Sequence, residues 1–319
     1  MLTSGGDAPG MNACLRAVVR AAAHFNLETV GIMRGYEGLV EAEFRPLAST
    51  DVSGIIHRGG TILQSARSPR FHNREWRRRA YANMRTEGID AMVVIGGDGT
   101  FTGANIFGEE FDIPIVGTPG TIDNDLFGTD FTIGYDTALN TALDAIDNIR
   151  DTAASHNRMF FVEVMGRDAG FIAMNTGIAG GAEAILIPES KTDIDALVHH
   201  LRGSRPTNSS SIVVVAEGDD QGGAVEIANK VKSRFDGYDT RVVVLGHIQR
   251  GGKPSCADRV LSTRLGVAAV EALLDGASAC MIGVAKNEVV RTPFDQAIKH
   301  HADISQSLLK LATLLNCYY

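Results

Sequence analysis

The feature that most constrains the fold is a series of short apolar runs with few polar residues between them. They lie at residues 29–33, 91–95, 113–118, 159–164, 184–187, 211–216 and 240–245. Strands with one face in water alternate apolar and polar residues, whereas strands covered on both faces read as continuous apolar runs. Longer stretches with helical periodicity lie between them, at residues 12–24, 137–151, 193–201 and 224–235. This alternation predicts an α/β protein with largely parallel sheets.

The size and charge of the chain restrict its class. A chain of 319 residues suits one large domain or two medium ones. The formal net charge of −8 argues against a nucleic-acid partner or an anionic membrane surface. The basic run at residues 74–79 is the exception. Because it lies in a helical pattern, we interpret it as a solvated helix face or a local anion contact rather than a nucleic-acid site.

The cysteines and the apolar runs bear on the compartment. Four cysteines are scattered along the sequence without CxxC or Cys/His ligand spacing, which is typical of reduced thiols in a cytosolic protein. We find no signal-like apolar region at the start and no apolar run near ~18 residues. We therefore expect a cytoplasmic protein without a membrane partner.

A glycine motif ends one of the apolar runs, in VVIGGDGTFTG at residues 93–103. Glycine lets the backbone approach a ligand closely, and a carboxylate such as that of Asp98 can recruit a hard cation. The motif therefore indicates a site for a metal-bound phosphate. An ordinary turn after a strand is the alternative, because turns also favour Gly and Asp.

A second glycine-rich turn, at residues 3–12, leads directly into a helical pattern. Free N–H groups and the positive end of the helix dipole suit a phosphate there. The alternative is a tight turn in which Asn12 lies near the helix cap. Arg16 and Arg20 are four residues apart on this helix, so that an anion between them, or a solvated face, accounts for the pair.

The third motif, PGTIDND at residues 119–125, gives the most specific indication of a chemical reaction, because it contains two closely spaced aspartates. Asp123 and Asp125 are two residues apart, so they would point the same way in an extended segment. One can act on a substrate hydroxyl while the other joins Asp98 at Mg²⁺. An Asx turn or a helix cap is the alternative role for these carboxylates.

The strand-end motifs fall into two groups along the chain, which predicts two lobes. One group lies at residues 4–10, 96–103 and 119–125, and the other at residues 165–170, 217–218 and 246–252. Ligands bind beyond the carboxyl ends of parallel strands. Two such sheets facing each other across a cleft can therefore hold two substrates.

The strings GGDAPGMN, GGDGT, PGTIDND, MGRDAG and LGHIQRGG, in this order, closely resemble the bacterial ATP-dependent 6-phosphofructokinases. The likeness runs from residue 2 to about residue 260. It implies two Rossmann-like α/β/α lobes with mainly parallel sheets and an active-site cleft between them. The larger, ATP-binding lobe would comprise residues 1–134 and 249–299, and the smaller, sugar-phosphate lobe residues 135–248 and 300–319. The family implies a homotetramer whose active sites are completed by a neighbouring subunit.

The resemblance also implies catalytic roles, with ATP as co-substrate and Mg²⁺ as cofactor. Asp123 matches the base that takes the proton of the sugar 1-hydroxyl, and Thr121 matches a hydroxyl on the transferring phosphoryl group. Arg67 and Arg167 match cations that offset charge in the transition state. The residues that match the metal site are Asp98 and Asp125. The residues that match the nucleotide site are Gly6, Tyr36, Arg67, Gly97, Asp98, Gly99, Thr100 and Gly103.

The second substrate implied by the resemblance is fructose 6-phosphate. The matching residues are Thr121, Asp123, Arg158, Met165, Gly166, Arg167, Glu217, Arg241, His247 and Arg250. Arg158 and Arg241 match a pair that is donated across the subunit interface, and arginine suits a phosphate ligand because of its planar fork. Glu217 matches a carboxylate that hydrogen-bonds the sugar hydroxyls.

Two glycines bear on the phosphoryl donor. Relatives that use pyrophosphate carry Asp in place of Gly99 and Lys in place of Gly120. A carboxylate at position 99 would repel and block the nucleotide α-phosphate, whereas glycine leaves room. The chain therefore has the pattern expected for ATP, and pyrophosphate is the alternative donor.

The resemblance extends only in part to the effector site. Arg16, Arg20, Arg150 and Glu183 match parts of a site for ADP and phosphoenolpyruvate. The loop at residues 204–209 lacks the lysines expected there, and the arginine usual at position 49 is a serine. We expect an altered or absent response to these effectors. His72 and Ser68 also replace an arginine and an aromatic residue near the nucleotide, so we expect a modest ATP affinity.

Two other functions would be compatible with parts of this pattern. A kinase for another sugar phosphate would share most of these motifs. A non-catalytic regulatory subunit would normally have lost the base or the metal carboxylates, but all three aspartates are present.

Overall fold

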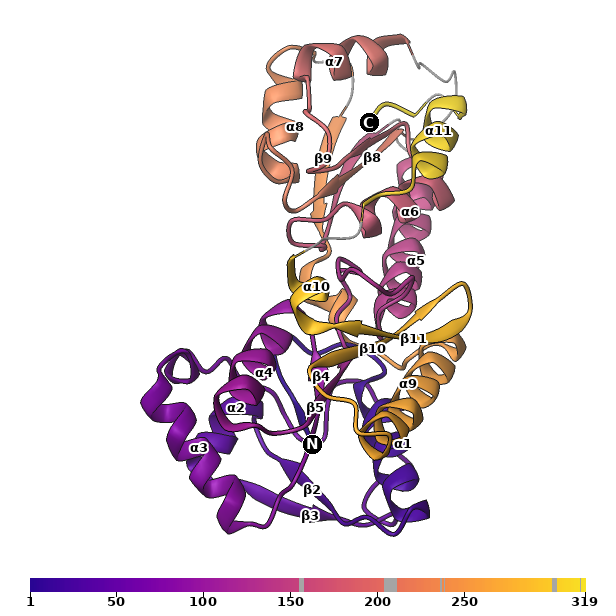
Figure 1. Ribbon diagram of the computed structural model, residues 1–319. Helices are drawn as coiled ribbons and strands as arrows, with labels where there is room; N and C mark the ends of the chain where they lie inside the picture. Colours follow the sequence, from indigo (N-terminus) through magenta and orange to yellow (C-terminus); the bar gives the residue numbers. More distant parts are fainter. Residues whose placement is uncertain (155–157, 204–210, 236, 238, 300–302, 316) are drawn as a thin grey trace. The chain divides into compact units, whose positions relative to one another are not determined.

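The computed structural model describes all residues except 155–157, 204–210, 236, 238, 300–302 and 316. The chain forms two compact units (Figure 1). The first comprises residues 1–122, 126–137 and 250–302. The second comprises residues 123–125, 138–249 and 303–319. Each unit is described by itself below.

The first unit is built on a seven-stranded sheet in the order β11-β10-β5-β4-β1-β2-β3. Its strands are β1 (Leu2–Thr3), β2 (Thr29–Ile32), β3 (Phe44–Leu47), β4 (Met92–Gly96), β5 (Ile115–Pro119), β10 (Cys280–Ala285) and β11 (Glu288–Pro293). The four inner pairings are parallel, and the pairs β2–β3 and β10–β11 at the two edges are antiparallel. The buried strands β4 and β5 explain the continuous apolar runs in the sequence.

Helices cover both faces of this sheet. They are α1 (Met11–His24), α2 (Gly35–Glu41), α3 (Arg74–Thr86), α4 (Asp98–Phe111), α9 (Cys256–Leu274) and α10 (Phe294–Lys299), with a short 3₁₀ turn η1 (Pro69–His72). Helices α1 and α9 pack against each other (Figure 1), and a Cβ at Gly266 would lie 2.7 Å from Ala17 Cβ. The other face packs on α2, α3, α4 and α10, with Phe101 stacked on Phe294 at a ring distance of 5.1 Å. This burial supplies the main stabilisation of the unit.

The second unit contains a four-stranded parallel sheet in the order β7-β8-β6-β9. Its strands are β6 (Arg158–Val164), β7 (Ala184–Leu186), β8 (Ser211–Ala216) and β9 (Asp239–Val244). Helices α7 (Ile194–Gly203) and α8 (Ala224–Lys232) cover one face, and α6 (Phe171–Ala179) packs on β7 and β8. The remaining elements are α5 (Tyr135–Ala154), α11 (Gln306–Leu314) and the 3₁₀ turn η2 (Gly246–Arg250). Strand β9 is an edge strand, and its Val244 is 53% exposed.

The predicted α/β fold with mostly parallel sheets is confirmed. The predicted strands and helices are all present, with ends that differ by up to three residues. The hairpin β10–β11 was not predicted. Its outer strand is largely exposed, and Lys286 and Asn287 turn with φ of 51° and 65°, a pattern that carries no Asn-Gly signal.

The expected assignment of nucleotide and sugar phosphate to separate lobes stays a prediction, as does a cleft between them. The compact units place residues 123–125 with the second unit, whereas the sequence placed them with the first. Among the described residues, no helix is both long and apolar enough to span a bilayer.

Candidate active site

Three glycine loops of the first unit meet at one edge of its sheet. Strands β1, β4 and β5 are parallel neighbours, so their carboxyl ends lie side by side. The Ser4 backbone N–H donates to Ile95 O at 3.0 Å, and that of Gly120 donates to Gly96 O at 3.0 Å. The Thr100 hydroxyl donates to Ser4 O at 3.2 Å. The structure therefore brings together the three loops that the sequence marked for phosphate and metal.

The helices that leave these loops begin without a side-chain cap. Gly10 precedes α1 with φ of 115°, and Gly97 precedes α4. In contrast, the Asn73 side chain caps α3 by accepting from the Glu75 backbone N–H. Uncapped first-turn N–H groups and the helix dipole favour an anion. Asp98 occupies the first turn of α4, where a cation on its carboxylate would meet that anion.

Asn12 does not cap α1. Its side-chain amide donates to the carbonyls of Arg58 and Gly59 at 3.2 and 3.1 Å, and its carbonyl accepts from the Ile62 N–H at 2.8 Å. Asn12 does lie near the start of α1, as the alternative reading expected, but its side chain bonds to the loop at residues 58–62 rather than to the helix N-terminus. Asn12 instead holds the loop at residues 58–62 against the glycine turn.

Tyr36 supports the start of α4. Its hydroxyl donates to Thr100 O at 2.5 Å, and a Cβ at Gly103 would lie 2.9 Å from its ring. The ring stacks on Phe71 at 4.2 Å between centroids. Burial raises the pKa of Tyr36, so the phenol keeps its proton and remains a donor. Three of the residues matched to the nucleotide site thus form one packed group.

Gly99 and Gly120 differ in their surroundings. A Cβ at Gly99 would meet nothing within 4 Å. A Cβ at Gly120 would lie 2.9 Å from Ile95 and 3.1 Å from Met11. Packing within the chain therefore accounts for the glycine at 120, but not for the one at 99. Gly97 is intermediate, because a Cβ added there would lie 3.6 Å from the Thr121 Cβ, an ordinary contact distance.

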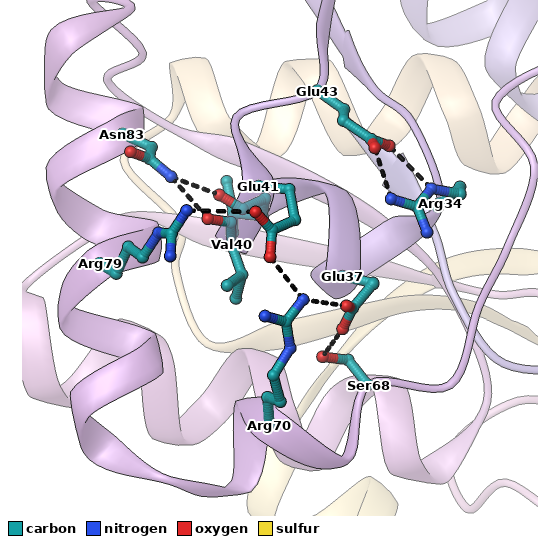
Figure 2. Close-up of polar contacts among 10 residues, drawn as sticks. Arg34, Glu37, Val40, Glu41, Glu43, Ser68, Arg70, Arg79 and Asn83 are labelled. Carbon is teal, nitrogen blue, oxygen red and sulfur yellow. Dashed lines mark hydrogen bonds and ion pairs between the residues drawn. The ribbon is translucent and has the colours of Figure 1, made fainter.

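The segment that carries Arg67 is attached to α2 by a network of charges (Figure 2). The Ser68 hydroxyl donates to Glu37 at 2.7 Å, and Arg70 pairs with both Glu37 and Glu41. The Arg70 hydrogen bond holds the pKa of Glu37 below its usual range. Ser68, where the resemblance leads us to expect an aromatic residue, thus binds α2. Arg67 itself is exposed.

A buried arginine holds the other end of this segment. Arg77 makes two hydrogen bonds of 2.7 Å to Glu110 on α4 and donates to the carbonyls of Phe71 and His72 at 2.8 Å. It comes from the basic run, most of which is exposed as the sequence predicted. The segment next to Arg67 is therefore fixed to both α2 and α4.

We expect Arg77→Met to lower the free energy of unfolding by about 3 kcal/mol, because it leaves Glu110 and two carbonyls without their shared donor. Arg74→Met is the matched control, since Arg74 lies 3.8 Å from the same carboxylate but its side chain is 74% exposed. The control should change stability by less than about 0.5 kcal/mol. Urea denaturation of both variants checks this, and equal losses would contradict it.

The PGTIDND segment is not extended. Asn124 adopts a left-handed conformation with φ of 54°, so the premise that placed Asp123 and Asp125 on one side is wrong. Asp123 is 7% exposed and Thr121 is equally buried. The Thr132 hydroxyl donates to Thr121 O at 2.6 Å, which fixes the start of the turn. A buried aspartate in a tight turn is well suited to hold one orientation.

Among the described residues, no group of three or more His, Cys, Asp or Glu side chains is arranged to hold a metal ion. A dedicated protein cage for Mg²⁺ is therefore not part of this structure as described. Mg²⁺ commonly uses one or two carboxylates together with substrate phosphates and waters. Asp98, in the first turn of α4, is a carboxylate of the kind that this smaller donor set needs.

Arg250 packs against the first glycine turn. Its guanidinium would lie 2.7 Å from a Cβ at Gly6, and it donates to Asp7 O at 3.3 Å. Gly6 therefore makes room for an arginine that the resemblance assigned to the sugar phosphate. The exposed His247 lies in η2, which ends at Arg250.

The second unit presents a turn at the carboxyl end of β6. Arg167 has φ of 56°, and its backbone N–H donates to Glu217 at 2.8 Å. A Cβ at Gly218 would lie 2.1 Å from Arg167 O, so only glycine fits there. Glu217, expected to bind sugar hydroxyls, thus also holds the turn that exposes the Arg167 side chain.

Gln249 was not identified from the sequence. It is fully buried, and its side-chain oxygen accepts from the Met165 N–H at 2.9 Å. It therefore fixes the backbone at Met165 and Gly166 from the neighbouring strand end. A glutamine between two recognisable residues, His247 and Arg250, gives no signal of this role in sequence.

Arg158 begins β6 and Arg241 lies opposite Phe160 on β9, whereas Arg167 and Glu217 follow the carboxyl ends of β6 and β8. Arg158 is the first residue of β6, and Arg167 comes three residues after the strand ends. Seven strand residues span roughly 20 Å. The start of β6 at Arg158 is therefore far from the turn that carries Arg167, which favours separate phosphate contacts for these two arginines.

The residues matched to an effector site are distributed over both units. Arg16 is half-buried and Arg20 exposed on α1. Arg150 donates to the carbonyls of Gly180 and Gly181, and Glu183 accepts from the Ile212 N–H at 2.8 Å. Burial raises the pKa of Glu183. The loop at residues 204–209 lies outside the described residues, so the expected change in effector response stays a prediction.

Comparison with known proteins gives concordant matches. The sequence model of one family, described as phosphofructokinase, matches residues 1–273. An ATP-dependent 6-phosphofructokinase 2 of Bacteroides thetaiotaomicron is 56% identical over 98% of this chain and 96% of its own. An ATP-dependent 6-phosphofructokinase 1 of Thermus thermophilus is 55% identical over 99% and 98%.

A solved structure agrees with these matches. The phosphofructokinase of Saccharomyces cerevisiae superimposes with a TM-score of 0.88 and 38% identity over 98% of this chain. This chain spans 46% of the length of the yeast chain.

Proposed function

The chain belongs to the phosphofructokinase family, and from this premise we propose that it is an ATP-dependent 6-phosphofructokinase. It transfers the γ-phosphoryl group of ATP to the 1-hydroxyl of fructose 6-phosphate, giving fructose 1,6-bisphosphate and ADP. The observation that carries this function is the meeting of three glycine loops at the ends of the parallel strands β1, β4 and β5, the last of which begins the PGTIDND motif.

The chemistry follows from the residues at these loops. The sugar 1-oxygen forms a bond to the γ-phosphorus while the bond to the ADP oxygen breaks, and Asp123 takes the hydroxyl proton. The Thr121 hydroxyl contacts the transferring group. Arg67 and Arg167 offset the charge that it spreads over its oxygens.

We also propose that the reaction uses Mg²⁺, held by Asp98 and Asp125. The ion neutralises phosphate charge when it is bound. The remaining nucleotide contacts come from Gly6, Tyr36, Gly97, Gly99, Thr100 and Gly103. Thr100, Tyr36 and Gly103 form the packed group described above, which supports their place in one binding surface.

The sugar phosphate is proposed to bind His247 and Arg250, with Glu217 at the sugar hydroxyls and Met165 and Gly166 in the adjoining turn. Arg158 and Arg241 serve the site of a neighbouring subunit in a homotetramer. The position of Arg158 at the start of β6, roughly 20 Å from the strand end that precedes Arg167, supports this division. The edge strand β9, with Val244 more than half exposed, and the equally exposed Ile248 in η2 offer a contact surface for the neighbour. The scattered reduced thiols support a cytoplasmic location.

Gly99→Asp tests the choice of ATP over pyrophosphate. The new carboxylate would face open space, and an acidic residue in the first turn of α4 favours the helix, so the variant should fold. We expect KM for ATP to rise roughly tenfold to hundredfold through repulsion of the nucleotide phosphates. Gly99→Asn, of equal size without the charge, is the control. Equal KM values for ATP in wild type and Gly99→Asp would contradict the role of Gly99.

The function itself is tested with a panel of acceptors. Purified protein with Mg²⁺ and ATP is given fructose 6-phosphate, glucose 6-phosphate or unphosphorylated fructose, and the phosphorylated products are identified. We expect fructose 1,6-bisphosphate from the first acceptor and no comparable turnover of the other two. Preferential use of another acceptor would replace the proposed substrate while keeping the proposed phosphoryl transfer.

A further inference from the structure

Two arginines of the second unit converge on one carboxylate oxygen. Arg158 Nε lies 3.0 Å from Asp239 Oδ2, and Arg241 Nη2 lies 2.9 Å from the same oxygen. The register of β6 and β9 explains why the two arginines reach the same carboxylate. Asp239 is the partner of Arg158 across β6 and β9, and Arg241, two residues along β9, is on the same face as Asp239.

This cluster adds little to the stability of the fold. The side chains of Arg158, Asp239 and Arg241 are 28%, 45% and 52% exposed, and ion pairs in such positions are weak. Its geometry nevertheless matches a ligand. Two guanidinium groups on one anionic oxygen are an arrangement that proteins use for phosphate.

We propose that Asp239 sets the affinity for the sugar phosphate by occupying, between Arg158 and Arg241, the position of a phosphate oxygen. The inference rests on the proposed function, which assigns these two arginines to the sugar phosphate of a neighbouring subunit. An incoming phosphate must displace the carboxylate or bind beside it against like charge, so Asp239 weakens substrate binding. The residue also keeps the two guanidinium groups from repelling each other when substrate is absent.

The test is Asp239→Asn, which removes the charge and keeps the size of the side chain. We expect KM for fructose 6-phosphate to fall roughly threefold to tenfold, because the phosphate no longer competes with a carboxylate. KM for ATP and kcat should stay within about twofold, since the cluster lies near the amino-terminal ends of β6 and β9, whereas Glu217 and Arg167 follow the carboxyl ends of β8 and β6. Asp239→Ser, which removes the charge with a smaller side chain, should lower KM for fructose 6-phosphate to the same extent. Asp239→Glu, which keeps the charge, should not lower it.

The control is Asp195→Asn, which changes the net charge equally within the same unit. Asp195 pairs with Arg234 at 2.8 Å and its side chain is 81% exposed. It should leave both KM values unchanged. A similar fall of KM in this control would reduce the effect to net charge and overturn the inference.

The remaining outcomes separate the inference from the function it rests on. An unchanged or raised KM for fructose 6-phosphate in Asp239→Asn and Asp239→Ser, with wild-type turnover and melting temperature, would overturn the role of Asp239 alone. A structural role would raise KM or lower stability, whereas competition lowers KM. Wild-type protein that does not phosphorylate fructose 6-phosphate would contradict the proposed function itself.

Discussion

Asp123→Asn is expected to lower kcat by about 10²–10⁴-fold, because the amide cannot take the proton of the attacking hydroxyl. The substitution keeps the size of a side chain that is only 7% exposed, in a turn whose start is fixed by Thr132. KM for ATP should change little, since the proposed role of Asp123 is at the acceptor. Steady-state kinetics with fructose 6-phosphate and Mg²⁺-ATP measure both quantities.

The matched control for Asp123 is Asp90→Asn, which makes the same chemical change at a carboxylate that is 93% exposed. Its kcat should equal that of the wild type. A purified Asp123→Asn protein with a wild-type melting temperature and turnover within a few-fold of wild type would remove Asp123 from its proposed role as the base.

The second large effect concerns the sharing of active sites between subunits. Asp123→Asn and Arg241→Leu are each expected to be nearly inactive when assayed alone at low fructose 6-phosphate. If Arg241 serves the neighbour's site, subunits of the two variants that are mixed and reassembled should regain activity. Random pairing gives an intact Asp123 and an intact Arg241 at about a quarter of the sites. The mixture should therefore reach roughly a quarter of the wild-type rate.

The control mixture combines Asp123→Asn with Thr121→Val, two defects in one turn. Every site then carries one of them, so the mixture should stay inactive. An inactive mixture of Asp123→Asn and Arg241→Leu, with hybrid oligomers demonstrated by mass, would show that each chain uses its own Arg241. It would contradict the shared site.

The sequence identified the loops because their signals are local. Gly96, Gly97 and Asp98 directly follow an apolar run, so a strand, a turn and a helix start could be read in order. Their meeting with the turn at residues 4–10 follows from parallel strands with neighbouring carboxyl ends. These inferences need no knowledge of distant side chains.

The supporting residues were not predictable in the same way. Gln249 and Arg77 act through partners 84 and 33 residues away in sequence, Met165 and Glu110. Asp239 reads in sequence as an ordinary surface residue before a strand, and only the register of β6 and β9 brings it to Arg158. The left-handed conformation of Asn124 was not predictable either, because the sequence Asp-Asn-Asp is compatible with both an extended segment and a tight turn.

The most direct test of the central claim measures fructose 1,6-bisphosphate formed from fructose 6-phosphate and Mg²⁺, with ATP in one reaction and pyrophosphate in the other. We predict product with ATP only, and none when Mg²⁺ is removed by a chelator. Product with pyrophosphate would contradict the role of Gly99 in selecting the donor, while leaving the acceptor and the base in place. Absence of product with either donor would contradict the proposed function.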